Sequence, residues 1–293
     1  MRPSTFSIVA CDLEKREWGL AVASKFLAAG AVVSWARAEV GAIATQARAK
    51  VGYGQEGLSL LAEGESAIAA LEAITSVDDD RVERQVGIVD RSGRAAAYTG
   101  EKCFDWAGHR VGDGYTCQGN ILVGPEVLEA MAMRFEALEA ELADRLAATL
   151  WAGDEAGGDR RGRQSAAVLV VRAGGGYGAD NDRYLDLRVD DDPDPVAKLV
   201  DLVAMHHVFF KPAIEIEFVS IEAEVAKELQ ALANRLGYYE GEPSGEWDQA
   251  SKEAFEVLIS NENLEERWSL DQDPDQIDTV ALDYLRRRFR REG

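Results

Sequence analysis

Two hydroxyl residues near the start of the chain, Thr5 and Ser7, are the candidate nucleophiles of this protein. They begin the first of two short apolar runs joined by a polar turn, a pattern that predicts a β-hairpin. Folding the hairpin about the middle of its turn places Thr5 opposite Ser24, with Lys25 next to it. A lysine ammonium lowers the pKa of a neighbouring acid and stabilises a developing oxyanion. These four residues could therefore perform nucleophilic attack, although Thr and Ser are also ordinary strand residues.

Polar side chains also end two later apolar runs. Thr45 and Gln46 end one of them, and Gln118 and Asn120 flank a glycine at the end of another. Side-chain amides at strand ends can polarise a substrate carbonyl, and they can equally cap turns. We therefore expect these four residues to bind substrate or stabilise an oxyanion if the strand ends meet.

A glycine-rich loop at 153–165 concentrates charge in a chain that has few bases. The candidate binding residues of this loop are Asp159, Arg160, Arg161, Arg163 and Ser165. Guanidinium groups on a flexible loop suit carboxylate or phosphate recognition. The loop is not a Walker A motif, because it lacks the GK[ST] ending and leads into a strand. It is predicted to orient an anionic substrate, and the alternative is a charged surface turn.

The histidines and cysteines do not predict a metal centre. Adjacent residues on a helix point about 100° apart, so His206 and His207 cannot comfortably share one metal ion. His109 is distant in sequence, and no HExxH or HxxE pattern occurs. The three cysteines are far apart and form no CxxC motif. We expect neither a metal nor another cofactor.

Charge excludes several classes of partner. The 53 acidic and 32 basic residues give a formal net charge of −21, which repels phosphate backbones and anionic lipids. The longest nearly uninterrupted apolar run, 26–36, is about half of what a membrane span needs. The N-terminus lacks the long apolar segment of a signal peptide. These features predict a cytoplasmic protein that acts on a small molecule and binds neither nucleic acid nor membrane.

The apolar patterning predicts a mixed architecture in which strands and helices alternate in blocks. Strands are predicted at 5–11, 18–24, 40–47, 84–90, 94–99, 114–119, 164–172 and 183–189. Helices are predicted at 54–63, 66–75, 125–136, 139–152 and 196–209. Strands that are apolar at consecutive positions imply sheets covered on both faces. The expected fold class is α+β, a four-layer α-β-β-α sandwich.

Composition changes after residue 212, which predicts two domains at 1–212 and 213–293. The second segment has 20 acidic against 9 basic residues, a balance of −11, with helical periodicity and little strand signal. We expect it to be a small all-α domain. With 293 residues the chain is long for one compact domain and comfortable for two.

Several stretches of the first domain carry a resemblance to a known family. The stretches are Phe6-Ser7-Ile8-Val9-Ala10, 19–26, Ala44-Thr45-Gln46-Ala47, Gln118-Gly119-Asn120 and 157–167. Together they resemble DUF1028, a family of uncharacterised bacterial proteins with an N-terminal-nucleophile (Ntn) hydrolase-like fold. The resemblance covers roughly residues 5–210 and implies the same four-layer sandwich, with its active site at the end of the first hairpin.

The resemblance implies a specific chemistry. Ntn hydrolases use the first residue of the mature chain as the nucleophile and its own α-amino group as the base. A free Thr5 amine would require cleavage after Ser4, because removal of Met1 alone leaves Arg2 at the terminus. The expected activity is hydrolysis of a C–N bond in a small anionic metabolite. The alternative is a non-catalytic protein in which the fold binds a ligand.

A second resemblance covers the C-terminal domain. Its motifs are Leu229-Gln230, Leu236-Gly237-Tyr238-Tyr239, Gly241, Gly245 and an amphipathic run through Phe255. They are similar to a family named as a putative peptidoglycan-binding domain, a small three-helix module. The charge of −11 opposes binding to an anionic polymer, so we expect the domain to pack on the first domain or a second copy. A glycan or protein ligand is the alternative. An apolar sandwich face could also pair two copies as a homodimer.

Overall fold

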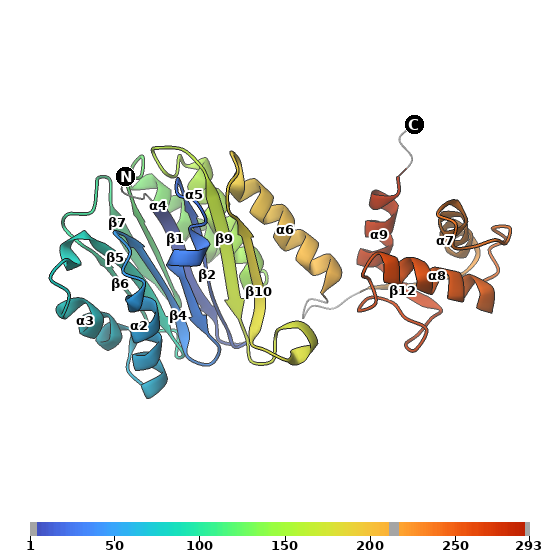
Figure 1. Ribbon diagram of the computed structural model, residues 1–293, viewed down its shortest axis with the longest axis horizontal. Coiled ribbons are helices and arrows are strands. Elements are labelled where there is room, and N and C mark those ends of the chain that lie inside the picture. The colour runs from blue at the N-terminus through green and yellow to red at the C-terminus, as the bar shows by residue number, and fades with distance from the viewer. Residues whose placement is uncertain (1–4, 211–216, 291–293) are drawn as a thin grey trace. The chain divides into compact units, whose positions relative to one another are not determined.

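The computed structural model describes residues 5–210 and 217–290, and the chain divides into two compact units (Figure 1). The units are Met1–Val203 and Ala204–Gly293, and the division falls within helix α6 (Pro195–Phe209). The domain boundary predicted after residue 212 lies outside the described residues.

The first unit contains a six-stranded antiparallel sheet with the hairpin at its centre. Its spatial order is β10 (Arg183–Val189), β9 (Ser165–Val171), β2 (Glu17–Ser24), β1 (Thr5–Asp12), β8 (Tyr115–Asn120) and β7 (Gly108–Gly112). The register pairs Phe6 with Ala23 across the hairpin, as the folding of the turn predicted. On its other side β1 pairs with β8, which sets Ser7 opposite Gln118. Two of the predicted site segments therefore lie on adjacent strands.

A second, four-stranded antiparallel sheet faces the first. Its order is β3 (Ser34–Arg37), β4 (Gly41–Ala47), β5 (Arg84–Asp90) and β6 (Ala95–Thr99). Residues such as Val9, Leu20 and Val89, from both sheets, form one buried apolar cluster between the two sheets. Every residue of β4 and β5 is buried, as expected for strands covered on both faces.

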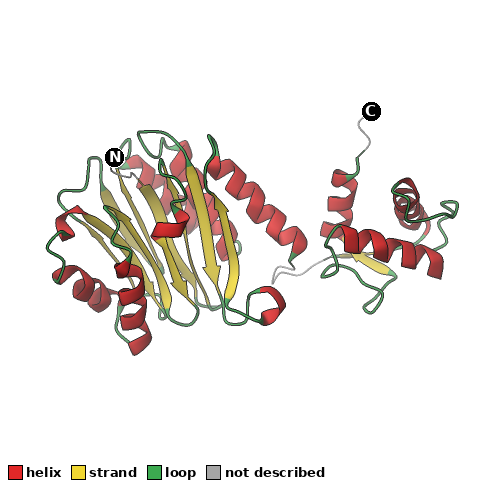
Figure 2. Cartoon of the chain, viewed as in Figure 1, coloured by secondary structure: helices red, strands yellow, loops and turns green. Residues whose placement is uncertain are grey.

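Helices cover the outer face of each sheet (Figure 2). On the large sheet, α4 (Glu126–Ala137), α5 (Leu142–Glu155) and the first part of α6 bury leucines such as Leu146 and Leu199. On the small sheet, α2 (Gly52–Glu63) and α3 (Ala67–Ser76) pack residues such as Leu61 and Ile74. The layer order is helix, sheet, sheet, helix, and the predicted α+β class is confirmed.

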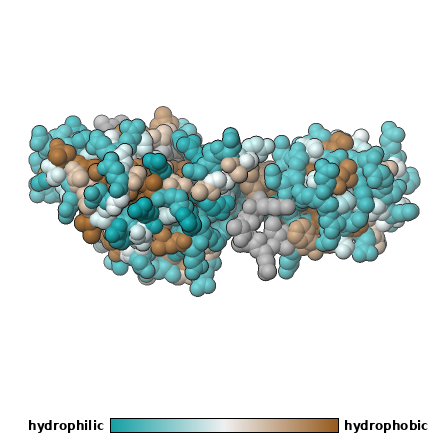
Figure 3. Space-filling view, turned by 90° about the horizontal axis from the view of Figure 1, so that it is seen from below, coloured by the Kyte–Doolittle hydropathy of each residue, from teal (hydrophilic) through white to brown (hydrophobic). Residues whose placement is uncertain are grey.

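The sequence missed the elements that are short or polar. These elements are α1 (Gly30–Val33), which has only four residues, and the strands β3 and β7. The two strands consist of half-buried and exposed residues and therefore lack an apolar run. Within the described residues no helix is long and apolar enough to cross a membrane. The face seen in Figure 3 is mostly hydrophilic with scattered apolar residues, which is ordinary for a protein surface.

The C-terminal unit contains α7 (Ala223–Arg235), α8 (Gln249–Asn261) and α9 (Thr279–Arg288) around a core that includes Phe255 and Trp268. The prediction of a helical C-terminal domain is confirmed, and the unit also contains one short strand pair that was not predicted. Two three-residue strands, β11 (Phe218–Ser220) and β12 (Gln276–Asp278), pair antiparallel. Strands this short leave no periodicity in the sequence.

Candidate functional site

The start of the hairpin brings two hydroxyl groups together. Thr5 is the first residue of β1 and Ser24 is the last residue of β2. Their hydroxyl oxygens lie 3.2 Å apart, and each residue is 2% exposed. On the other side of β1, Thr5 is in register with Asn120 at the end of β8. Thr5 therefore lies between a hydroxyl and an amide at one edge of the large sheet.

Ser7 lies deeper and is surrounded by neutral amides. Its hydroxyl donates to Gln46 Oε1 and accepts from Gln118 Nε2, both at 2.6 Å, and the residue is fully buried. A carboxamide cannot take up the proton of an attacking hydroxyl at neutral pH. The geometry thus makes Ser7 a link between the two sheets and leaves Thr5 as the candidate nucleophile.

Gln85 connects these amides and was missed by the sequence analysis. Its Oε1 accepts from Gln46 Nε2 at 2.8 Å and from Asn120 Nδ2 at 2.9 Å. Its own Nε2 donates to the Gly119 carbonyl at 2.8 Å and to Thr99 Oγ1 at 2.9 Å. The available signal was a glutamine directly before the apolar run 86–89, but the pattern alone did not place it beside the other amides.

We define the amide network as Ser7, Gln46, Gln85, Thr116, Gln118 and Asn120, all at most 1% exposed. Thr116 extends it by donating to Gln118 Oε1 at 2.7 Å. Gly87 faces the network from β5, and a Cβ there would lie 2.2 Å from Gln118 Oε1. A side chain at that position would displace the amide, so the glycine is required for the network to form.

Lys25 does not lie where the sequence analysis expected it. Its Nζ donates to the Arg163 carbonyl at 3.0 Å, and its backbone N–H donates to Asp159 Oδ2 at 2.8 Å. Among the hydrogen bonds of the described residues, none joins the lysine ammonium to Thr5 or Ser7. The strand β2 ends at Ser24, and the exposed side chain that follows reaches the neighbouring loop instead.

The arginine loop is organised around its own carboxylates. Asp159 is 7% exposed and accepts from Arg161 Nη2 at 2.9 Å. Asp154 accepts from Arg163 Nε at 2.9 Å; burial raises the pKa of Asp154, and Arg163 partly offsets this. Arg160 is exposed, and its backbone N–H donates to the Ile121 carbonyl. Two of the three guanidinium groups are thus engaged within the loop.

The remaining predicted residues make local contacts. Ser165 Oγ donates to the Phe26 carbonyl at 2.6 Å and accepts from the Ala29 N–H at 3.1 Å. Thr45 Oγ1 donates to the Lys50 carbonyl at 3.2 Å. These bonds fix the turns that follow β2 and β4, so both residues support the site from outside the network.

Both strand ends beside Thr5 have strained backbone. Ala47 follows Gln46 with φ of 66°, and Ile121 follows Asn120 with φ of 54°. Residues with a Cβ rarely adopt this region, and for β-branched isoleucine it is an outlier. Such strain persists where the surrounding structure enforces it, which is common at functional sites. A small pocket lies between these strand ends and is lined by Ala47 and Asn120.

The cysteines are not suited to nucleophilic attack. Burial raises the pKa of Cys11 to about 12 and that of Cys103 to about 11. Because the thiolate is the reactive form, both thiols are protonated and unreactive at neutral pH. Cys117 is fully buried, and burial raises its pKa as well.

Comparisons with known proteins agree with the division into two units. A family of unknown function, DUF1028, matches residues 5–199, and a family described as "Putative peptidoglycan binding domain" matches residues 208–285. A crystal structure of a DUF1028 protein from Silicibacter pomeroyi is similar, with a TM-score of 0.64 and 33% sequence identity. The similarity covers 70% of this chain and 86% of that chain. No curated protein matches the sequence.

Proposed function

The chain belongs to the DUF1028 family of unknown function, and we propose that its first unit is an N-terminal-nucleophile amidohydrolase acting on a small anionic amide. Thr5 is the nucleophile, and removal of residues 1–4 supplies its free α-amino group. The observation that carries the proposal is the position of Thr5. It begins the central strand of the large sheet, with its hydroxyl 3.2 Å from that of Ser24.

The reaction proceeds through an acyl-enzyme. The Thr5 amine takes the hydroxyl proton while Oγ1 attacks the amide carbon, and an α-amino group with a pKa near 7.7–8.0 suits this role at neutral pH. The C–N bond then breaks, and the same proton passes to the leaving nitrogen. Water attacks the resulting ester, releasing the carboxylic acid and restoring the hydroxyl group of Thr5.

Neighbouring residues position the reacting groups. Ser24 orients the Thr5 hydroxyl through their 3.2 Å contact. Two amides were expected to stabilise the oxyanion, and Asn120 is in register with Thr5 whereas Gln118 is in register with Ser7. We therefore assign the oxyanion to Asn120, which Gln85 holds in place through a 2.9 Å hydrogen bond.

The test uses two forms of the protein and a reactive probe. One form is the full chain, and the other begins at Thr5 after release from a fusion that leaves no extra residue. Each is treated with a β-lactone, whose carbonyl is attacked by the hydroxyl, so that the ring C–O bond opens and leaves an ester. We expect an adduct on Thr5, located by mass spectrometry, only in the form that begins at Thr5.

Two variants decide the identity of the nucleophile. In the form that begins at residue 5, Thr5→Ser should keep the adduct and Thr5→Ala should lose it. The proposal would be contradicted if Thr5→Ala formed as much adduct as the form that begins at Thr5, or if that form gave no adduct. The intact mass of the protein purified from cells shows whether residues 1–4 are lost without engineering.

A second candidate function is ligand binding without catalysis. In the full chain the Thr5 nitrogen is part of a peptide bond, and the residue is 2% exposed. A protein that keeps all 293 residues would have no α-amino base at this position. The C-terminal unit would then provide a second binding function, for a glycan or a protein partner. A full-length intact mass with no β-lactone adduct in either form favours this candidate.

A further inference from the structure

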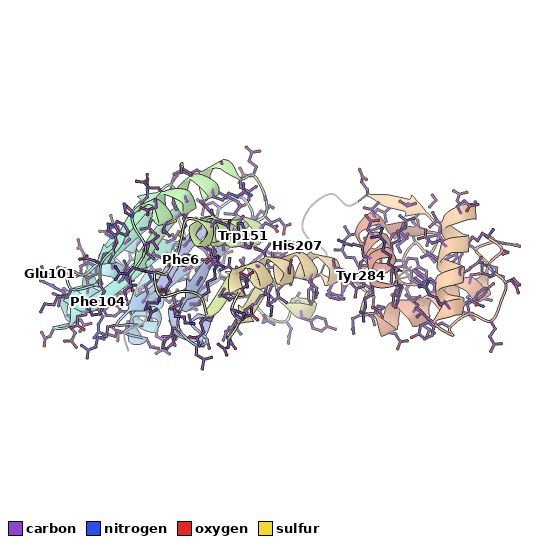
Figure 4. All side chains as sticks on the ribbon, turned by 90° about the horizontal axis from the view of Figure 1, so that it is seen from above. Phe6, Glu101, Phe104, Trp151, His207 and Tyr284 are labelled. Carbon is purple, nitrogen blue, oxygen red and sulfur yellow. The ribbon has the colours of Figure 1, made fainter. Side chains whose placement is uncertain are left out.

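The segment between β6 and β7 connects the two sheets beside Thr5. The Lys102 N–H donates to the Val82 carbonyl at 2.7 Å, on the side of the small sheet. The Phe104 carbonyl accepts from the Ile121 N–H at 2.9 Å, on the side of the large sheet. Figure 4 shows Glu101 and Phe104 together at one end of the first unit. The segment is thus fixed at both edges, and its side chains are held over the strand ends.

The pocket beneath this segment carries a net positive charge. Its lining includes Arg48, Glu83 and Lys102, together with Asn120 of the proposed oxyanion site. Arg48 Nη1 lies 3.1 Å from Glu83 Oε2, so those two charges compensate each other. Lys102 is exposed and forms no ion pair with any residue that the structure describes. One uncompensated cation therefore remains beside the proposed site.

We propose that a carboxylate of the amide substrate binds at the mouth of this pocket, whose enclosed volume is only about 10 Å³, with the exposed Lys102 as the residue that selects it. The inference rests on the proposed function and adds the place where the anion binds. The chain has a formal charge of −21, so an anionic substrate needs a local cation to approach the site. The half-exposed Phe104 ring in the same pocket offers an apolar surface for the carbon chain of the substrate.

The arginine loop is a poorer choice for the same role. Asp159 holds Arg161, and Asp154 holds Arg163, each through hydrogen bonds of about 2.9 Å. Binding a substrate carboxylate to Arg161 or Arg163 would break an existing pair, so little free energy would be gained, and of the three loop arginines only the exposed Arg160 could bind it without that cost. Lys102 has no such competitor among the described residues, and its ammonium is a point charge on a flexible chain.

A matched pair of chromogenic amides tests the inference. Glutaryl-p-nitroanilide carries a carboxylate, and pentanoyl-p-nitroanilide has the same chain length without it. In the form that begins at Thr5, Lys102→Met should lower kcat/KM for the glutaryl compound about tenfold and leave the pentanoyl compound unchanged, the scale of one charge-assisted contact at an exposed site. Lys102→Arg should keep most of the preference. Lys198→Met, which removes the same charge from an exposed lysine paired with Asp192, is the control.

Binding separates this inference from the catalytic proposal. Calorimetry with glutaric acid monoanilide, on the form that begins at residue 5 and carries Thr5→Ala, measures affinity without turnover. Lys102→Met should weaken binding about tenfold, and Lys198→Met should change it less than about twofold. If neither p-nitroanilide is hydrolysed but Lys102→Met weakens binding of the monoanilide, the carboxylate site is supported and the catalytic role of Thr5 is contradicted. Equal binding by the Lys102→Met and Lys198→Met variants overturns the pocket, whatever the hydrolysis result.

Discussion

The first unit buries neutral amides and hydroxyls at the strand ends around Ser7, whereas the C-terminal unit buries an ion pair between Arg267 and Asp278. In the amide network the hydrogen bonds join side chains that carry no formal charge. In the C-terminal unit Arg267 Nη1 lies 3.2 Å from Asp278 Oδ2, and both side chains are completely buried. The two clusters solve the same problem, the satisfaction of buried polar groups, with different chemistry.

The ion pair joins the ends of two helices. Arg267 Nε donates to the Val208 carbonyl at 2.7 Å, and another of its nitrogens donates to the His207 carbonyl, both in the last turn of α6. Asp278 Oδ1 accepts from the Ala281 N–H at 2.7 Å and caps the start of α9. Arg267 and Asp278 bind each other and backbone groups of the two helices, which indicates a structural role.

The amide network leaves a different environment beside Thr5. A fixed buried charge would shift the pKa of a reacting group by attraction or repulsion. Neutral amides orient their neighbours through hydrogen bonds and add no net charge. In the proposed mechanism the charged groups near the reaction are then the Thr5 amine, the substrate, Lys102 and the paired Arg48 and Glu83. The ion pair therefore stabilises the fold of the C-terminal unit, whereas the amide network can support chemistry in the first unit.

The largest expected effect comes from breaking the buried ion pair. Asp278→Ala leaves the Arg267 guanidinium buried without its anion and removes the cap of α9. We expect the free energy of unfolding of the C-terminal unit to fall by about 3–5 kcal/mol, the usual cost of removing one partner of a buried pair. Hydrogen exchange of peptides from α8 and α9, followed by mass spectrometry, reports on this unit alone.

A surface pair provides the control for that prediction. Arg286 and Glu228 form a two-pronged hydrogen bond at 2.9 and 2.8 Å, and both side chains are more than 40% exposed. Arg286→Ala should cost at most about 1 kcal/mol. If Asp278→Ala costs no more than Arg286→Ala, the ion pair does not stabilise the unit and the contrast with the amide network is lost.

Much of the first unit could be predicted from sequence because its signals are local. The hairpin turn fixes the register, so the approach of Thr5 to Ser24 followed from counting along two strands. The role of Gln85 could not be predicted in the same way. Its position beside Asn120 depends on how two separate sheets face each other, and strand periodicity does not encode that distance.

Lys25 and Arg267 show the limit for charged residues. The side chain of a lysine that follows a strand can point toward the adjacent strand or toward a nearby loop. Here Lys25 donates a hydrogen bond to the Arg163 carbonyl, in a loop far along the chain. Arg267 and Asp278 are ordinary charges in an acidic sequence, and nothing in their spacing marks them as buried. Complete burial of such residues depends on tertiary packing around the pair.

A smaller effect is expected when the neutral network is broken. Ser7→Ala leaves Gln46 Oε1 and Gln118 Nε2 without the hydroxyl that joins them. Gln118 Nε2 still donates to the Ser7 carbonyl at 3.3 Å, whereas Gln46 Oε1 keeps the desolvation cost of a buried neutral acceptor, so the first unit should lose about 1–3 kcal/mol of stability. Hydrogen exchange of peptides from β1 and β8 measures the change.

The control is an exposed serine with a comparable hydrogen bond. Ser59 donates to the Gln55 carbonyl on the surface of α2, and Ser59→Ala should change stability by less than about 0.5 kcal/mol. Ser7→Ala should also keep the β-lactone adduct on Thr5 in the form that begins there. Loss of the adduct in a variant that remains folded would show that Ser7 takes part in attack, and the division of roles between the two hydroxyls would be wrong.

The smallest effect is a pH dependence beside the amide network, where Gln85 is hydrogen-bonded to Thr99. Thr99 Oγ1 accepts from Gln85 Nε2 and lies 2.9 Å from His109 Nδ1, so the threonine proton is available to the imidazole. His109 lies at the surface, and partial desolvation of its ring lowers its pKa below the ordinary value of 6.5. As the pH falls, the unfolded chain therefore binds a proton on this histidine before the folded chain does, and the folded state loses stability.

We accordingly expect a modest decrease in the free energy of unfolding of the first unit between about pH 7 and pH 5, because an unfolded histidine titrates near pH 6.5. Urea denaturation at several pH values, compared between the wild-type chain and His109→Gln, isolates this contribution, since every other titratable group is common to both. The glutamine can still accept a hydrogen bond from Thr99, but it does not titrate. The wild-type chain should lose more stability than the variant across this range. Parallel curves would show that His109 keeps an ordinary pKa, and Thr99 would then not couple the amide network to a titratable group.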